Sequence, residues 1–185
     1  MIKKNFIPTI NISSINNLDF SSKSSINTIK KIEKACVEVG FFQVTGHGIS
    51  ASSIDSICKI GNKFFNSSEK NKRKISPKKW NKKNKNIYRG YFPNDVNGKE
   101  GLDIGDLEVT KKYASSIKNK YIEYLNLKKS IDKKSIKSLK NYFDNIFLLG
   151  EKLFKIIIKL YNKDLNNSKK VFSRCKTLST LRFNY

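Results

Sequence analysis

The sequence predicts a fold of the α+β class, in which helices and a few short strands share one polypeptide. Apolar residues recur at helical spacing in several stretches, the longest of which covers residues 135–162. Short aromatic and β-branched runs such as 41–45 separate these stretches and are typical of strands. The 185 residues are 38% hydrophobic and 11% aromatic, which is enough for a packed core and too apolar for a disordered chain.

The N-terminal part of the chain is predicted to alternate strands with helices. Residues 6–12 are interpreted as an edge strand, because Pro8 cannot donate to a strand partner. A helix is expected over residues 25–39, closed by Gly40, and a strand follows at 41–45. The apolar stripe of this helix comprises Ile26, Ile29, Ile32, Cys36 and Val39.

A second helix is predicted to begin near Ser50 or Ser52, and a short helix is expected at 67–70. Residues 70–86 then hold most of the local charge and are predicted to form a mobile surface loop, since little except Ile75 and Trp80 can pack. The elements expected after this loop are a strand at 87–92, a turn-rich loop at 98–105, an alternating segment at 107–110 and a polar connection to about residue 134.

The C-terminal part is dominated by the helix at 135–162. Its apolar stripe is wide, which predicts packing against a sheet. A short helix is expected at 168–173, followed by a strand at 177–185. Alternation places Leu178, Thr180, Arg182 and Asn184 on one face of this strand and Ser179, Leu181, Phe183 and Tyr185 on the other.

The composition is strongly basic, with a formal net charge of +23. Only four of the 38 basic residues are arginine, and lysine is mixed with asparagine, isoleucine and serine along the whole chain. Because arginine is the residue best suited to phosphate and guanine, this pattern favours a compositional origin of the charge over a nucleic-acid partner.

Several other classes of site and location are disfavoured. Cys36, Cys58 and Cys175 are widely spaced and form no CxxC motif, which fits free thiols in a reducing compartment. The sequence shows neither a signal peptide nor an apolar run long enough to span a membrane. We therefore predict a cytoplasmic protein with no membrane partner.

The residues alone reveal no set of catalytic side chains. His47 is the only histidine, so a two-histidine metal site cannot form within one chain. Its setting between Gly46 and Gly48 predicts a tight turn in which the imidazole has a structural role. Nucleotide-binding glycine motifs, HExxH and GxSxG are all missing. The carboxylates Asp103, Asp106 and Glu108 are interpreted as a solvated cluster.

Four blocks of sequence occur in an order that resembles the N-terminal region of the isopenicillin N synthase-like family of non-haem Fe(II)/2-oxoglutarate-dependent dioxygenases. They are IPTINIS (7–13), AC-VEVGFFQVTGHGIS (35–50), FFNSSEKNK (64–72) and YRGYFP (88–93). The second block is the most specific, although Gly46 replaces the usual asparagine. LRFNY (181–185) is similar to the start of the family's L-R-x-N-Y-Y-P strand, the first strand of its catalytic barrel.

The resemblance implies a helical N-terminal domain, residues 1–176, that packs on a double-stranded β-helix barrel whose first strand is 177–185. In that family a His-x-Asp pair and a distant histidine hold Fe(II), and an Arg-x-Ser binds 2-oxoglutarate. The resemblance therefore implies that the metal ligands and most of the barrel are missing here and that this chain alone is inactive. Fe(II), 2-oxoglutarate and a small-molecule substrate are expected for the complete protein.

The matched blocks also imply residues near the substrate pocket. Arg89 could instead be a surface arginine beside the basic loop, and Asn184 and Tyr185 could be ordinary strand residues with no role at a substrate. The five candidates are Arg89, Tyr91, Arg182, Asn184 and Tyr185.

Two other functions stay open. A non-enzymatic basic module would bind nucleic acid or an anionic surface through the lysines of 70–86. A fragment that complements a separate barrel chain would dock through the edge of the terminal strand. Marginal stability is expected for the isolated chain, because the far face of the long helix and the terminal strand would be exposed.

Overall fold

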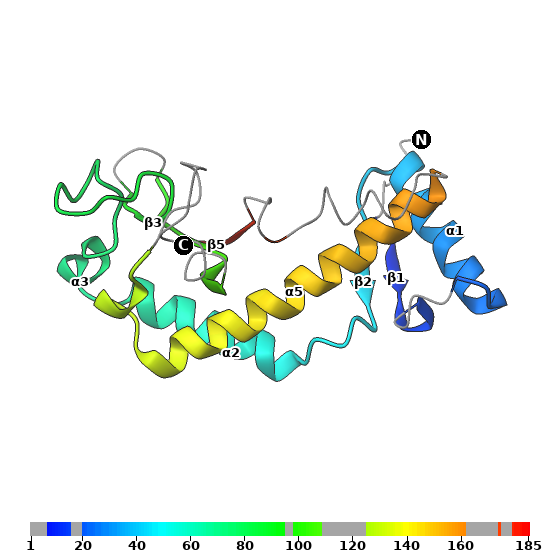
Figure 1. The fold of residues 1–185 in the computed structure, drawn as a ribbon, viewed down its shortest axis with the longest axis horizontal. Helices are drawn as coiled ribbons and strands as arrows, with labels where there is room; N and C mark the ends of the chain where they lie inside the picture. The colour runs from blue at the N-terminus through cyan, green and yellow to red at the C-terminus, as the bar shows by residue number, and fades with distance from the viewer. Residues whose placement is uncertain (1–6, 16–19, 95–97, 109–124, 162–173, 175–178) are drawn as a thin grey trace. The chain divides into compact units, whose positions relative to one another are not determined.

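The computed structural model describes residues 7–15, 20–94, 98–108, 125–161, 174 and 179–185, and its fold over this part is α+β (Figure 1). The elements group into two compact units, each with its own core. The first unit comprises Met1–Ile49 and Phe147–Phe172, and the second comprises Ser50–Ile146 and Ser173–Tyr185.

The first unit combines a two-stranded parallel sheet with one helix and the C-terminal part of the long helix α5. Ile10 on the first strand lies opposite Val44 on the second. The core beneath them includes the fully buried Ile12, Ile32 and Ile156. The elements are β1 (Thr9–Asn11), the 3-10 helix η1 (Ser13–Ile15), α1 (Lys23–Glu38), β2 (Gln43–Thr45) and α5 from Phe147 onward.

Helix α1 buries Ile32 of the predicted stripe, but its buried face also includes small and polar residues. Its N-cap is Ser22, whose hydroxyl accepts a hydrogen bond from the Ser25 amide at 3.1 Å. Thr28 is buried, with its hydroxyl 2.9 Å from that of Ser14, whereas Ile26 is 43% exposed. The prediction that Ile26 belongs to the buried stripe is wrong, because polar residues of α1 find partners in η1 and can be buried instead.

The second unit is built on a three-stranded antiparallel sheet in the order β3-β4-β5. Leu102 and Ile104 of the central strand are 1% exposed and share a core with Phe64 and Leu139. The elements are α2 (Ala51–Phe65), α3 (Glu69–Arg73), β3 (Gly90–Phe92), β4 (Gly101–Gly105), η2 (Leu127–Lys129), the part of α5 (Lys133–Leu160) up to Ile146, and β5 (Thr180–Asn184).

The prediction of a turn-rich loop at 98–105 is wrong, because Gly101–Gly105 form β4. Leu102 lies opposite Tyr91 of β3 and Phe183 of β5. The glycines and the aspartate of GLDIG alternate with its two apolar residues and occupy the face away from the core. Glycine and aspartate are typical of turns, so the alternation of apolar and other residues in this strand was not recognised from the sequence.

The lysine-rich segment 70–86 buries more residues than the prediction of a surface loop allowed. Ile75 is 1% exposed, and Asn84 is 7% exposed. The Asn84 side-chain amide donates to the backbone carbonyls of Lys74 at 2.9 Å and Ser76 at 2.8 Å. Buried asparagine amides therefore fix the backbone here, so polar residues that are typical of loops supply the order.

The remaining predicted elements differ from the observed ones mainly in where they begin and end. The predicted helix at 135–162 is confirmed as α5. Residues 107–108 are helical, so the alternating segment at 107–110 is not a strand where it is described. The helix expected at 168–173 lies outside the described residues. Over the described part, no helix combines the length and the apolar character that crossing a membrane requires.

The predicted strands are confirmed in shortened form. Those expected at 6–12, 41–45 and 87–92 are each three residues long. The terminal strand is β5, and its exposure alternates as predicted. Leu181 and Phe183 pack against the core of the second unit, whereas Thr180, Arg182 and Asn184 are exposed.

Candidate functional site

Arg182 and Asp103 form an ion pair in the middle of the sheet, on the face opposite the core. The two residues are direct partners in the β4–β5 register. Nε of Arg182 donates to Oδ1 of Asp103 at 2.6 Å, and Nη2 donates to Oδ2, so the contact is bidentate. These hydrogen bonds raise the pKa of Arg182 above its ordinary value. The side chain of Asp103 is 3% exposed and that of Arg182 is 61% exposed.

A pocket of about 260 Å³ lies beside this ion pair. One wall is aromatic, formed by Trp80 and Phe92, whose rings pack edge to face with centroids 5.7 Å apart. Arg182 and Asn184, two of the predicted substrate-pocket residues, both line the pocket. The terminal strand thus contributes two of the five side chains that the family pattern indicated, whereas the aromatic wall was not anticipated from the sequence.

Arg89 lies at the other end of the same face and does not line this pocket. Its guanidinium donates a hydrogen bond to the hydroxyl of Thr180 on β5. A β-carbon on Gly105 would lie 3.1 Å from Nε of Arg89. The glycine therefore leaves the space in which Arg89 crosses β4.

Tyr91 is placed in the core rather than in the pocket. It is 0% exposed, and its ring packs edge to face against Phe64 with centroids 5.8 Å apart. Its hydroxyl donates to Oε2 of Glu69 at 3.1 Å. Burial raises the pKa of Tyr91 to about 12, and the hydrogen bond to Glu69 adds to that rise. A role for Tyr91 beside a substrate stays a prediction.

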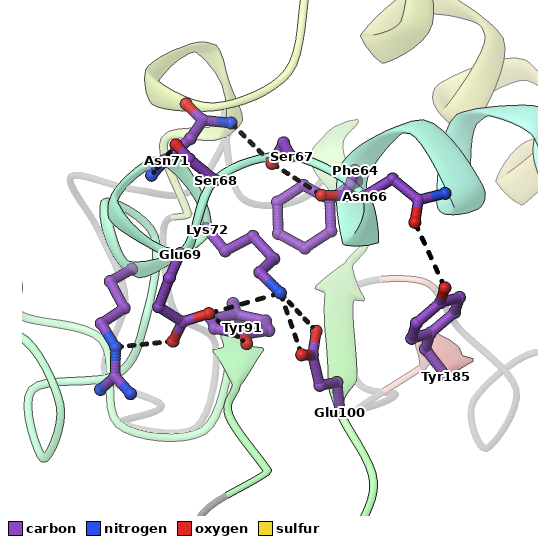
Figure 2. A network of polar contacts seen from close by, with 11 residues as sticks. Phe64, Asn66, Ser67, Ser68, Glu69, Asn71, Lys72, Tyr91, Glu100 and Tyr185 are labelled. Carbon is purple, nitrogen blue, oxygen red and sulfur yellow. Dashed lines mark hydrogen bonds and ion pairs between the residues drawn. The ribbon is translucent and has the colours of Figure 1, made fainter.

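Lys72 is the centre of a buried ion cluster that the sequence did not reveal (Figure 2). Its ammonium donates to both carboxylate oxygens of Glu100, at 2.9 and 2.8 Å, and lies 3.3 Å from Glu69. It also lies 5.1 Å from the centroid of the Tyr91 ring. Burial opposes its charge, yet the hydrogen bonds to Glu100 hold the pKa of Lys72 well above its ordinary value. The spacing of Glu69 and Lys72 on α3 was a readable signal, whereas the contact with Glu100 was not.

Tyr185 follows β5 and contacts the end of α2. Its ring stacks on Phe65 with centroids 5.0 Å apart. Its hydroxyl donates to Oδ1 of Asn66 at 3.3 Å (Figure 2). Its backbone exchanges two hydrogen bonds of 3.0 Å with Glu100. Tyr185 is thus held by its neighbours outside the pocket, and its predicted role near a substrate stays untested.

The interpretation of the carboxylate cluster as solvated is wrong for two of its members. Asp103 and Asp106 are 2% and 8% exposed. Asp106 accepts two hydrogen bonds from Arg174, at 2.6 and 2.7 Å, and Arg174 also contacts Asp144 at 2.7 Å. Long-range partners in other elements bury these carboxylates. Glu108 is the exposed member of the cluster.

His47 lies in the turn after β2, where its Nδ1 accepts a hydrogen bond from the Ile49 amide at 3.1 Å. Gly46 and Gly48 both have positive φ angles, and a β-carbon on Gly46 would lie 2.4 Å from Oδ1 of Asn11. The turn therefore requires glycine at position 46. Among the described residues, no three histidine, cysteine, aspartate or glutamate side chains come together as metal ligands. These residues do not fit an iron site.

The described site offers groups that bind a ligand. Arg182 provides a fixed cation, Asn184 provides an amide, and the aromatic wall provides an apolar surface. Two acidic residues line the pocket, and the carboxylates of both are paired with cations: Asp103 with Arg182, and Glu100 with Lys72 in the buried cluster.

Comparison with known proteins identifies related sequences. Residues 7–147 match the family model described as non-haem dioxygenase in morphine synthesis N-terminal. A probable iron/ascorbate oxidoreductase from Dictyostelium discoideum is 29% identical over 183 residues, covering 90% of this chain and 47% of that protein. Feruloyl CoA ortho-hydroxylase 2 from Arabidopsis thaliana is 30% identical over 139 residues, covering 72% of this chain and 36% of that protein.

Solved structures share the fold. The Arabidopsis thaliana dioxygenase for auxin oxidation 1, in its binary complex with 2-oxoglutarate, matches with a TM-score of 0.64 at 18% identity. The match covers 97% of this chain and 56% of that one. At this identity the likeness shows the fold alone. The chain spans about half, or less, of the length of the curated relatives named here.

Proposed function

Because the chain belongs to the non-haem dioxygenase family, whose N-terminal domain it matches over residues 7–147, we propose that the complete protein is a 2-oxoglutarate- and Fe(II)-dependent oxygenase acting on a small molecule. The match to this domain carries the proposal. The Dictyostelium relative is named as an iron/ascorbate oxidoreductase, and the Arabidopsis structure holds 2-oxoglutarate. The first name supports iron and the second supports 2-oxoglutarate as cofactors of the complete protein.

In this proposal the present chain supplies the N-terminal domain, residues 1–176, and the first strand of the barrel, residues 177–185. It does not supply the iron site. His47 is the only histidine, and its Nδ1 is engaged with a backbone amide. The ligands for iron would therefore come from residues beyond Tyr185, and the chain alone would have no oxygenase activity.

The outer face of β4 and β5 is proposed to face the substrate. Arg182 and Asn184 project from this face into the pocket, while Leu181 and Phe183 point to the core. This division fits a strand that belongs both to the core of the second unit and to the wall of a barrel. Arg89 lies on the same face and is proposed to contact the part of the substrate that extends beyond the pocket.

The proposal is tested by comparing this chain with the protein encoded by the complete reading frame. The longer protein, loaded with Fe(II), is expected to release labelled carbon dioxide from carboxyl-labelled 2-oxoglutarate. The 185-residue chain is expected to release none above a protein-free control. Turnover by the chain alone would refute the division of roles, and lack of turnover by the longer protein with iron bound would refute the oxygenase assignment.

The same assay distinguishes a barrel encoded in the same reading frame from a barrel carried by a separate polypeptide. If a separate polypeptide carries the barrel, adding it to this chain should restore turnover that neither chain has alone. Restoration would place the barrel on a second polypeptide and leave the proposed chemistry unchanged.

A further inference from the structure

The aromatic wall of the pocket is fixed by local structure. The Trp80 amide donates to the carbonyl of Pro77 at 2.9 Å, and Pro77 is fully buried. The Trp80 ring then packs against Phe92 at an interplanar angle of 81°. A wall that is ordered before binding loses little conformational entropy when a ligand packs on it. With a volume of about 260 Å³, the pocket is suited to a single ring with a short substituent.

The charged groups around this wall favour an anion. Lys79 and Lys99 both line the pocket, and the Lys79 ammonium lies 4.7 Å from the centroid of the Trp80 ring. Of the acidic residues that line the pocket, Asp103 is paired with Arg182, and the carboxylate of Glu100 contacts Lys72 in the buried cluster. Because positive charge is left over, the potential in the pocket attracts an anionic group.

Arg182 adds directional donors to this potential. Its pair with Asp103 uses Nε and Nη2, which leaves the N–H groups of Nη1 as further donors. The contact with Asp103 fixes the plane of a guanidinium that is 61% exposed. A planar carboxylate is the group that such donors recognise best.

We propose that the pocket formed by Trp80, Phe92, Lys79, Lys99 and Arg182 binds a small aromatic carboxylate, and that the substrate of the complete oxygenase belongs to this class. The proposal about substrate rests on the proposed function. The ring packs on the aromatic wall, and the carboxylate lies among the cationic side chains.

Trp80 is the only tryptophan of the chain, so its fluorescence reports directly on this wall. Phenylacetate is the probe, titrated at low salt into the 185-residue chain with excitation at a wavelength that phenylalanine and tyrosine do not absorb. We expect a saturable change of Trp80 emission, with a Kd on the order of 1 mM for so small a ligand. Phenylacetamide, which has the ring without the charge, should bind about fivefold more weakly, and added salt should weaken the binding of phenylacetate.

Variants place the binding in this pocket. Lys99→Gln is expected to raise the Kd for phenylacetate about threefold, because an exposed charge contributes modestly to the binding free energy. Lys82→Gln removes the same charge from an exposed position of the same segment that does not line the pocket, and it should bind as the parent chain does. Far-UV circular dichroism checks that both variants stay folded. Saturation-transfer NMR of phenylacetate measures binding independently of Trp80.

Equal affinity for the acid and the amide would overturn the proposal, as would equal effects of the two lysine substitutions or lack of binding by both methods. If binding fails while the longer protein still turns over 2-oxoglutarate, the ligand class is refuted and the oxygenase assignment stands. If phenylacetate binds as expected but the longer protein has no turnover, the pocket stands and the assignment of its ligand as an oxygenase substrate falls.

Discussion

On each face of the β3-β4-β5 sheet, a cationic side chain contacts both oxygens of a carboxylate, and the two cations differ in their exposure to solvent. On the core side, the Lys72 side chain is 7% exposed and contacts Glu100, Glu69 and the Tyr91 ring. On the outer side, Arg182 has a similar bidentate partner yet is 61% exposed. The difference indicates that the buried cation serves stability, whereas the exposed cation keeps donors for a ligand.

The largest effect is expected for Lys72→Ala. This change leaves the largely buried carboxylate of Glu100 without its cation, and breaking a buried pair from one side costs about 3 kcal/mol or more. Urea denaturation followed by circular dichroism measures the free energy of unfolding. Lys70→Ala is the matched control, since Lys70 is an exposed lysine of the same helix and its loss should change stability by less than about 0.5 kcal/mol. A similar decrease in the free energy of unfolding for both variants would contradict a structural role of the Lys72 cluster.

A smaller effect on stability is expected for Arg182→Gln, about 1.5 kcal/mol, because water can partly replace the guanidinium beside Asp103. The same variant should lose most of its binding of phenylacetate. Adding Asp103→Asn removes the unpaired carboxylate and should recover part of the lost stability without restoring binding. If Arg182→Gln lowers the free energy of unfolding as much as Lys72→Ala does, the proposed difference in role between the two cations is contradicted.

A further effect, confined to alkaline pH, concerns the pH dependence of stability. Burial raises the pKa of Tyr91 to about 12, so the folded chain holds this proton more tightly than the unfolded chain, in which tyrosine titrates near pH ~10. The stability linked to Tyr91 is complete below that pH and is lost as the pH rises toward about 12. Tyr91→Phe should therefore show a shallower alkaline decline than the parent in urea titrations between these values. Parallel declines would show that Tyr91 does not titrate as the cluster requires.

Periodicity alone predicted the elements in which one residue type dominates each face. The apolar stripe of α5 and the alternation of β5 belong to this group. It failed where polar residues have structural roles. Asn84 orders the lysine-rich segment through backbone contacts, and Asp103 gives β4 the composition of a turn.

The candidate site was predictable only in part, for a similar reason. Family resemblance indicated Arg182 and Asn184, and both line the pocket. The partner of Arg182 is 79 positions away in sequence, and the contact depends on a strand pairing that local patterns do not encode. The same holds for Glu100, which reaches Lys72 from a separate segment. Contacts that decide whether a charge is buried are therefore set by the fold and not by the neighbouring residues.

The most direct test of the central claim is to read the coding sequence beyond the codon for Tyr185. An oxygenase whose N-terminal domain is this chain predicts that Tyr-Pro follows at once, then a His-x-Asp pair and a distant second histidine as ligands for iron. A reading frame that encodes no such residues, with no separate barrel polypeptide that restores 2-oxoglutarate turnover, would contradict the account.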